Sequence, residues 1–332
     1  MNQSPTDSRT LAQQLQPTLD SLELGRQQAL QRIRQGWKRI TIGIVATLAL
    51  SGLVLATAVS INQDGSALAF IPLAVGLAYC IITYSQFNSG HRAIYEYAYK
   101  EQVVSGMTRL IQPEVNYSPG RGISESTFKE TGLYSSSIDR YHCEDLFAGK
   151  IGNTEIMFSE VHAEEQKETT DSDGNTRTYW SDIFKGLMVI VDFNKDFRSW
   201  LTIKPDFAEK SFGWIGRKIQ NFSPNLVRLE NPDFERAFVV HGSDQVEARY
   251  ILTPDFQERL LELRRWFGND IRLAFYRSRL HLTIPNDSNW FEPNFNLPAH
   301  NLTQMQTFTR QMTSVFRLVE ILDLNTRIWT KQ

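Results

Sequence analysis

The stretch ITIGIVATLALSGLVLATAVSI at residues 40–61, followed by SALAFIPLAVGLAYCIITYSQF at residues 66–87, decides the architecture of this chain. Each run has 22 residues and carries no charged side chain. About 20 helical residues cross the ~30 Å hydrocarbon core of a bilayer, and a helix satisfies its own backbone hydrogen bonds there. Only residues 62–65 separate the two runs. We therefore expect a two-helix transmembrane hairpin at residues 40–87.

The charges beside the runs indicate an orientation. Residues 24–39 contain five Lys or Arg and no acidic residue, whereas the connection between the runs has only Asp64. Lys and Arg beside a span are retained in the cytoplasm, so both termini are expected there, with the protein in the cell inner (plasma) membrane. A secretory signal peptide fits poorly, because a polar leader of 39 residues precedes the first run.

The leader at residues 1–39 carries apolar residues at helical spacing. They recur at multiples of three, four or seven residues between residues 8 and 37, namely Leu11, Leu15, Leu19, Leu22, Leu30 and Ile33. This pattern predicts an amphipathic leader helix that packs on the soluble domain or on the membrane surface. The alternative is a short coiled coil that joins two copies of the chain.

Small residues four apart mark one face of each apolar run. They are Gly52, Ala56 and Ser60 in the first run, and Ala74 and Ala78 in the second. Small residues let helix backbones approach closely in lipid. We expect them to pack the hairpin against itself, with oligomerisation as the alternative. The absence of ionisable residues inside both runs argues against a channel or a pump.

The remaining residues, 88–332, predict one cytoplasmic α+β domain in which antiparallel strands dominate and helices pack against them. The expected strands are 144–151, 154–163, 183–193, 200–204, 226–230, 237–241, 247–252, 271–275 and 280–284, with a polar loop at 164–178. Helices are expected from Thr253-Pro254, where Thr suits the cap and Pro the first helical position, and from about Thr303.

Composition limits the classes of function. The chain has 35 basic and 37 acidic residues without a basic cluster, which argues against a nucleic-acid partner. Its two cysteines, Cys80 in the second apolar run and Cys143 in the domain, provide no disulfide framework. No cofactor motif or metal-ligand spacing is present, so we expect no cofactor and no metal.

The densest acid and base groups are Glu144, Asp145, Glu160 and His162. Glu160 and His162 point to the same face of their predicted strand, and a carboxylate beside a histidine can serve as general acid and base. No nucleophile motif or phosphate-binding loop accompanies them. We therefore expect no catalysis, with these four residues as the candidates if the protein is an enzyme.

The loop after the second predicted strand resembles an incomplete EF-hand. Asp171, Asp173, Asn175 and Asp182 occupy its positions 1, 3, 5 and 12. Position 6 is Thr176, where a sharp turn requires Gly, and position 12 is Asp in place of a bidentate Glu. A mobile hairpin loop is expected, with a calcium site as the alternative.

Two further groups of residues are candidates for contacts with partners. Asp244, Glu247 and Arg249 predict a structural ion pair of Arg249 with a nearby carboxylate, and ligand binding is the alternative. Residues 207–222 mix aromatic and cationic residues, which suits a membrane surface. The candidates for that contact are Phe212, Trp214, Arg217 and Lys218. A helix that covers the core is the alternative for this segment.

Several motifs together resemble the bacterial DUF3137 family, whose name denotes a domain of unknown function. They are YHCEDLFAGKIG at 141–152, FSEVHA at 158–163, IFKGL at 183–187, DFNK at 192–195 and the stretch 229–254. The resemblance covers most of residues 90–325 and implies a bacterial membrane protein with two spans before the domain. Where the family has Gly-Glu-Asp, this chain has Cys143-Glu144-Asp145 and loses a glycine turn. The family has no assigned activity, so the resemblance implies nothing about chemistry.

These observations predict a membrane-anchored cytoplasmic binding or scaffold module that is not catalytic and whose ligand is unknown. Its expected partners are the lipid bilayer and either an unknown protein or a second copy of the chain. The alternative is a membrane-tethered enzyme that uses the four carboxylate and histidine candidates above.

Overall fold

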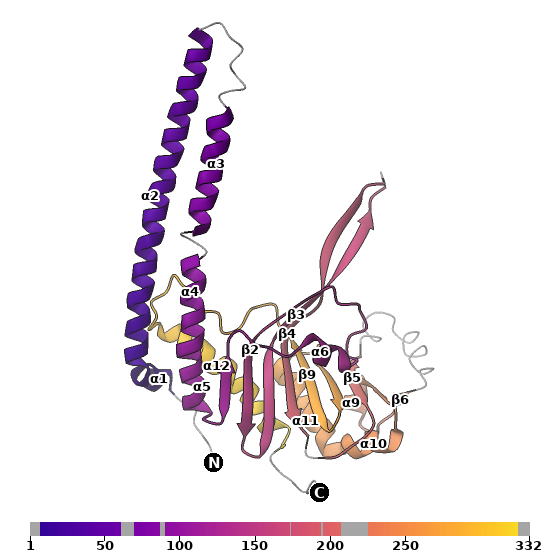
Figure 1. Cartoon of the computed structure of the whole chain (residues 1–332). Helices are drawn as coiled ribbons and strands as arrows, with labels where there is room; N and C mark the ends of the chain where they lie inside the picture. Colours follow the sequence, from indigo (N-terminus) through magenta and orange to yellow (C-terminus); the bar gives the residue numbers. More distant parts are fainter. Residues whose placement is uncertain are drawn as a thin grey trace. The chain divides into compact units, whose positions relative to one another are not determined.

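The structure is a computed structural model that describes residues 7–60, 70–86, 90–172, 174–193, 195–206 and 225–324 (Figure 1). It divides into two compact units. One comprises residues 104–291 and 307–324, and the other comprises residues 7–103 and 292–306. The chain is α+β, with one long apolar helix near its amino terminus and an antiparallel sheet. At this level the predicted fold class is confirmed.

The first unit is built on a nine-stranded sheet in the order β1-β2-β3-β4-β9-β8-β5-β7-β6, with every described pairing antiparallel. The strands are β1 Val115–Ser118, β2 Arg140–Ile151, β3 Thr154–Thr170, β4 Thr176–Asp192, β5 Leu201–Pro205, β6 Leu226–Val227, β7 Phe238–Gly242, β8 Arg272–Tyr276 and β9 Arg279–Pro285. The helices are α5 Ser105–Ile111, α6 Glu125–Glu130, α9 Pro232–Ala237, α10 Gln245–Ile251, α11 Pro254–Phe267 and α12 Leu302–Ile321, the last of which starts in the second unit.

The two predicted β-hairpins are confirmed. β2 and β3 meet at a turn where Gly152 has φ 60°. β8 and β9 meet at Arg277 and Ser278, which have φ 52° and 56°. Positive φ at both central residues is what a type I′ turn requires, and its twist matches that of the strands. The predicted start of α11 is also confirmed, because the Thr253 side chain accepts a hydrogen bond from Phe256 N.

Two predicted elements are wrong. The polar loop expected at residues 164–178 is instead a ribbon, because β3 and β4 stay paired from Glu164 opposite Asp182 to Thr170 opposite Thr176. Figure 1 shows this ribbon extending beyond the rest of the sheet. The strand expected at residues 247–252 is the helix α10, whose first turn is capped by the Asp244 side chain.

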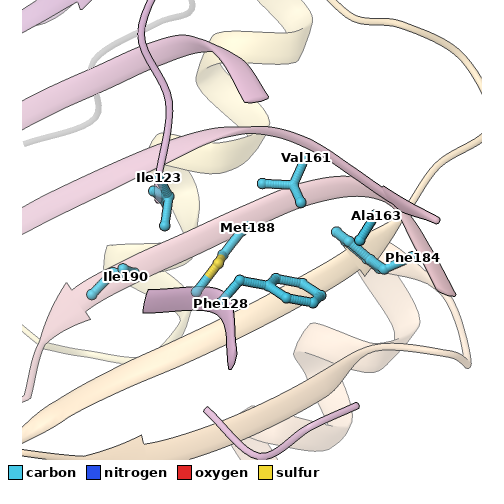
Figure 2. Close-up of a cluster of buried hydrophobic side chains, with 7 residues drawn as sticks. All are labelled: Ile123, Phe128, Val161, Ala163, Phe184, Met188 and Ile190. Atoms are coloured by element: carbon cyan, nitrogen blue, oxygen red, sulfur yellow. The ribbon is translucent and has the colours of Figure 1, made fainter. Parts of the chain in front are cut away.

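Both faces of the central strands are covered. On one face, Phe158 stacks on Phe147 at 4.4 Å and contacts Phe316 of α12 at 6.0 Å. On the other face, Phe128 of α6 packs in a buried cluster with residues of β3 and β4 (Figure 2). The cluster consists of Ile123, Phe128, Val161, Ala163, Phe184, Met188 and Ile190. Burial on two faces explains the continuous apolar run that β4 carries at residues 187–191.

The second unit contains α1 Ser8–Gln14, α2 Gln16–Ser60, α3 Phe70–Tyr84, α4 Gly90–Tyr99 and most of the π-helix Lys100–Val104. α2 continues from the leader into the first apolar run without interruption. Leu11, Leu19 and Leu22 of the predicted stripe are buried within the chain. A dimeric coiled coil needs such a stripe exposed for a partner helix, so the leader's burial favours the packed amphipathic helix.

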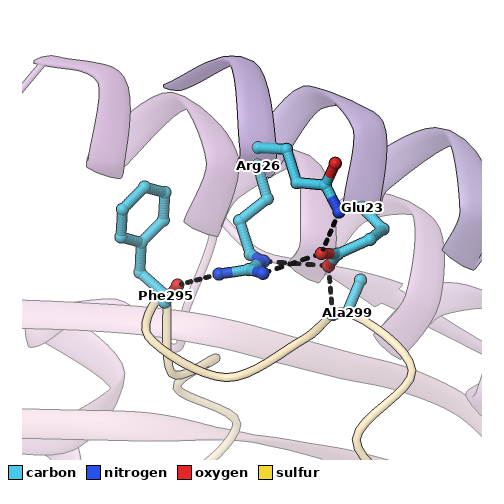
Figure 3. A network of polar contacts seen from close by, with 5 residues as sticks. Glu23, Arg26, Phe295 and Ala299 are labelled. Atoms are coloured by element: carbon cyan, nitrogen blue, oxygen red, sulfur yellow. Dashed lines mark hydrogen bonds and ion pairs between the residues drawn. The ribbon is translucent and has the colours of Figure 1, made fainter. Parts of the chain in front are cut away.

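A polar network attaches the leader to residues 292–306 (Figure 3). The Glu23 carboxylate accepts hydrogen bonds from Arg26 at 2.7 Å and from the backbone N–H of Ala299 at 2.8 Å. Arg26 also donates to the Phe295 carbonyl at 3.2 Å. The hydrogen bond from Arg26 is the main reason that the pKa of Glu23 falls to about 2. The network is therefore fully charged at neutral pH.

α2 and α3 pack side by side and antiparallel (Figure 1). The Trp37 and Tyr84 rings meet edge to face at 5.8 Å. Further along, a Cβ atom added to Gly43 would lie 2.7 Å from the Tyr79 ring, and one added to Gly76 would lie 2.1 Å from Thr47 Cγ2. The two residue numbers of each contact sum to nearly the same value, as an antiparallel pair requires.

The small residues predicted to form this contact lie elsewhere. Gly52, Ala56, Ala74 and Ala78 are exposed, and a Cβ atom on Gly52 would meet nothing within 4 Å. That prediction is wrong in its residues, because the close approach uses Gly43 and Gly76 on a different face of each helix. The Ser60 side chain lies outside the described residues.

Within the described residues, α2 is the one helix long and apolar enough to cross a membrane, and α3 is an apolar helix of 15 residues. Only 11% of the apolar window of α2 is buried. Bulky apolar side chains are exposed along both helices, for example Leu53 at 61% and Leu77 at 64%. A core helix of a soluble protein would bury these side chains, so these helices present an apolar surface to their surroundings.

Candidate functional site

The pairing of β2 with β3 brings the predicted acid and base residues together. Glu144 lies directly opposite Glu160, and His142 lies directly opposite His162. Residues directly opposite one another share a face of the sheet. Carboxylate oxygens of Glu144, Asp145 and Glu160 all lie within 4.8 Å of one another. We call these three residues the acidic cluster.

Asp145 joins the cluster through a β-bulge. The register of β2 on β3 shifts between Glu144 and Phe147, and Asp145 has φ 58°. Asp tolerates this left-handed conformation better than most residues, and a bulge redirects a side chain. The buried Asp145 carboxylate accepts a hydrogen bond from the Tyr117 hydroxyl, and its backbone N–H donates to the Pro119 carbonyl at 3.1 Å. These contacts tie the bulge to β1 and the loop after it.

The Glu160 carboxylate holds the loop that follows β9, because it accepts a hydrogen bond from the backbone N–H of Trp290. Gly186 allows this loop to approach β4. It has φ 147°, and a Cβ atom there would lie 2.2 Å from the carbonyl oxygen of Ile284. Asn286 N donates to the Lys185 carbonyl at 2.9 Å. A Cβ atom at 186 would therefore collide with the backbone where β9 ends and this loop begins.

A second group of metal-ligating residues lies further along the same strands. His162 Nε2 lies 2.7 Å from Asp182 Oδ1, and Glu164 places a carboxylate oxygen within 4.8 Å of both. The Asp182 side chain is exposed. On the neighbouring strand, His142 lies 3.5 Å from Glu144. Each histidine therefore has a carboxylate beside it.

The pocket at the acidic cluster limits what the residues can do. Its volume is about 60 Å³, whereas sites for small molecules usually measure about 300–1,000 Å³. Its lining comprises His142, Glu144, Glu160, Val161, His162, Lys185, Gly186, Asn286, Ser288 and Asn289. The oxygen ligands of the acidic cluster suit Mg²⁺ or Ca²⁺, and His162 with Glu164 and Asp182 suits Zn²⁺. The space fits an ion or a water molecule and is too small for an organic substrate.

One protein family matches part of the chain. Residues 182–324 match the DUF3137 family. Its description is "Protein of unknown function". The predicted resemblance is confirmed over these residues, which run from within β4 to just beyond α12, whereas the similar motifs at 141–152 and 158–163 lie outside the match. No curated protein and no solved structure matches the chain.

The predicted binding residues Asp244, Glu247 and Arg249 lie inside the DUF3137 region, where each has a structural contact. Asp244 accepts hydrogen bonds from the first turn of α10. Hydrogen bonds from Ser199 lower the pKa of Glu247 and tie it to the segment before β5. Arg249 donates to the carbonyls of Gln245 and Arg228. Carbonyl acceptors thus take the place of the expected ion pair in the described part of the chain.

The EF-hand-like residues do not form one loop. Asp171 accepts a hydrogen bond from Asn175 N at 2.9 Å in the turn between β3 and β4. Asp182 lies six pairs down the ribbon, about 20 Å away at 3.4 Å per residue. This separation contradicts the calcium alternative for that loop. Asp173 lies outside the described residues, as do the membrane-surface candidates Phe212, Trp214, Arg217 and Lys218.

Sequence reasoning missed the residues that hold the acidic cluster in place. Tyr117 lies in β1 and Trp290 lies in the DUF3137 region, far from Glu144 in the chain. The Gly-Asn turn sets the hairpin register only as far as Phe147 opposite Phe158, and continuing that register would place Val161 opposite Glu144. The bulge shifts the register by one residue and brings Glu160 there instead. No local signal indicated that a bulge would turn Asp145 toward them.

Proposed function

We propose that this chain is a membrane-anchored cytoplasmic binding or scaffold module, held in a bacterial inner membrane by a two-helix hairpin with both termini in the cytoplasm. The observation that supports this proposal is the exposed apolar surface of α2 and α3. In water such a surface would drive aggregation, whereas in lipid it costs nothing.

The packing of α3 on α2 supports two spans. The contacts Trp37–Tyr84, Gly43–Tyr79 and Gly76–Thr47 place α3 alongside the apolar part of α2. A helix that lies along a membrane span occupies the same depth of the bilayer. The 15 residues of α3 extend about 22 Å at 1.5 Å per residue, and the apolar sequence continues on both sides of it.

The aromatic pair supports the orientation. Trp37 and Tyr84 are both partly exposed and lie at the same level of the hairpin. Trp37 directly precedes Lys38 and Arg39 in the sequence. Trp and Tyr are enriched where the membrane meets water, and Lys and Arg beside a span stay in the cytoplasm. This end of the hairpin is therefore the cytoplasmic end in our proposal.

A binding role accounts better than catalysis for the acidic cluster. Two of its carboxylates accept hydrogen bonds that hold neighbouring segments, Asp145 from Tyr117 of β1 and Glu160 from Trp290 in the loop after β9. A catalytic carboxylate must instead reach a substrate, and the pocket of about 60 Å³ holds none.

One observation favours a membrane-tethered enzyme as a second candidate, namely the convergence of three carboxylates beside His162. Such a site would work through a divalent cation. Manganese binding to the full chain, followed by its electron paramagnetic resonance, tests this candidate. Saturable binding that Glu144→Gln abolishes supports the enzyme, and the lack of binding contradicts it.

Membrane fractionation tests the proposed anchoring. The full chain is expected to stay in the membrane pellet at alkaline pH and to enter solution only with detergent. Protease added to intact spheroplasts is expected to leave the α+β domain uncut, and to digest it after lysis. Release by alkali alone, or digestion in intact spheroplasts, would contradict the proposal.

A further inference from the structure

A second pocket lies in the first unit, on the face of the sheet where α6 ends. Its volume is about 460 Å³, within the usual range of small-molecule sites. Thr202 of β5 lies opposite His241 of β7, so both face the pocket together with Lys204, two residues along β5. The aromatic residues Trp200 and Tyr276 are also part of the lining.

The pocket is lined by one lysine, Lys204, and Arg272 lies close enough to affect that lysine's charge. The Lys204 ammonium donates to the Gly132 carbonyl at 3.2 Å, and burial, followed by the charge of Arg272, lowers its pKa. Arg272 donates to the Leu133 carbonyl at 3.2 Å. Neither cation forms an ion pair with a carboxylate in the part of the chain that the structure describes.

Two neighbouring groups add no negative charge. Burial, together with the charge of Lys204, lowers the pKa of His241, so its imidazole is neutral at pH 7. Glu130, the carboxylate of the lining, is paired with Arg277 at 3.7 Å. Lys204 is therefore a half-buried cation. Its ammonium group has three N–H donors, and among the described residues it donates to one carbonyl, that of Gly132. A half-buried cation without a counter-charge is costly, and an anion relieves that cost.

We propose that this pocket binds a small organic anion, with its carboxylate or phosphate on Lys204 and a flat or apolar body against Trp200 and Tyr276. Lysine serves as a point-charge partner for either anion, and aromatic faces suit a planar body. This inference deepens the proposed binding function by naming a ligand class, and it does not depend on how the chain is inserted in the membrane.

Calorimetric titration of the full chain in detergent tests the inference with three probes of similar shape. Phenyl phosphate or benzoate is expected to bind saturably, and the neutral benzamide at least tenfold more weakly. The tighter of the two anions identifies phosphate or carboxylate as the preferred group. Equal binding of benzamide, or no binding of either anion, would overturn the inference.

Matched lysine variants localise the binding. Lys204→Met is expected to weaken anion binding about tenfold or more, as loss of a charge-assisted hydrogen bond does. Lys195→Met is the control, because Lys195 is also half-buried with a lowered pKa and donates to a carbonyl, that of Tyr250. If Lys204→Met fails to fold, Lys204→Arg is the second test, because it keeps the charge and is expected to bind the anion. Unchanged binding by Lys204→Met would overturn the inference and leave the membrane fractionation result unaffected.

Discussion

The contact of Gly76 in α3 with Thr47 in α2 predicts how this helix pair responds to one added methyl group. Gly76→Ala places a Cβ atom 2.1 Å from Thr47 Cγ2 and 2.8 Å from Thr47 Cβ. Rotation of the Thr47 side chain leaves its Cβ in place, so the two backbones must separate. Restoring an ordinary carbon–carbon contact of about 3.5 Å to the Thr47 Cβ at 2.8 Å requires a shift of roughly 0.7 Å even after that rotation.

Overpacking of this kind costs about 1–3 kcal/mol, which weakens the pairing of α2 with α3 roughly 5- to 150-fold. Gly52→Ala is the matched control in the same apolar helix pair, because nothing lies within 4 Å of its added Cβ. Thr47→Gly combined with Gly76→Ala is expected to restore the pairing, since the three atoms nearest to the added Cβ all belong to the Thr47 side chain.

Cross-linking of a cysteine pair measures the pairing. Ile40→Cys and Thr83→Cys are suitable in a background without Cys80 and Cys143, because both positions are buried and fall at the same level as the contacts above. The cross-linking yield in membranes is expected to fall with Gly76→Ala and to stay unchanged in the control. An equal yield in both variants would refute the antiparallel register described here.

Three further predictions concern stability, measured by thermal unfolding of the full chain in detergent. Burial lowers the pKa of His281 to about 4 from an ordinary 6.5, so stability is full above pH 6.5 and falls by up to about 3 kcal/mol as the pH drops to 4. His281→Gln is expected to flatten that slope, and an unchanged slope contradicts the assignment. Glu23→Gln breaks the pairing with Arg26 and is expected to cost about 1–2 kcal/mol at pH 7 after solvent screening; no cost would show that the leader network is unimportant. Gly186→Ala is expected to cost more than about 2 kcal/mol, because the added Cβ meets the Ile284 carbonyl at φ 147°, and an unchanged unfolding temperature would contradict that geometry.

Hairpins and capped helices were predictable because their signals are local. The Arg277-Ser278 turn is flanked by alternating apolar residues, and Thr253-Pro254 marks the start of α11. The turn at Gly152 likewise sets the register from Ile151 opposite Thr154 to Phe147 opposite Phe158. These features need no information about distant parts of the chain.

The strand predicted at residues 247–252 is wrong although the sequence carries a local signal for the helix α10. Asp244 and Glu247 are three residues apart, the spacing of a capping box, and Asp244 caps the helix. Its buried residues, Ala248 and Ile251, are also three apart, as on a helix face. The alternation over so few residues resembled a strand because short segments fit both periods.

The sequence of the ribbon formed by β3 and β4 lacks the alternation of apolar and polar residues that predicts a strand. Beyond Glu164 its residues are mostly exposed on both faces, so apolar and polar side chains do not alternate. The pairing of the two backbones continues nonetheless from the buried part of the sheet.

The residues that line the two pockets are brought together by contacts that sequence patterns do not reveal. The direction of Asp145 depends on a bulge and on Tyr117 in another strand. The pocket at Lys204 depends on β5 lying between β7 and β8, and on the end of α6. In the same way, the spacing of small residues on α2 does not show which face of that helix meets α3. The contact is made by Thr47 of α2 and Gly76 of α3.

Labelling of two single cysteines tests the membrane hairpin most directly. In a chain without Cys80 and Cys143, Asp64→Cys marks the connection between the apolar runs and His142→Cys marks the exposed surface of the domain. A membrane-impermeant maleimide added to intact spheroplasts is expected to label position 64 fully and position 142 only after lysis. Labelling of position 142 in intact spheroplasts, or of position 64 only after lysis, would contradict the hairpin and its orientation.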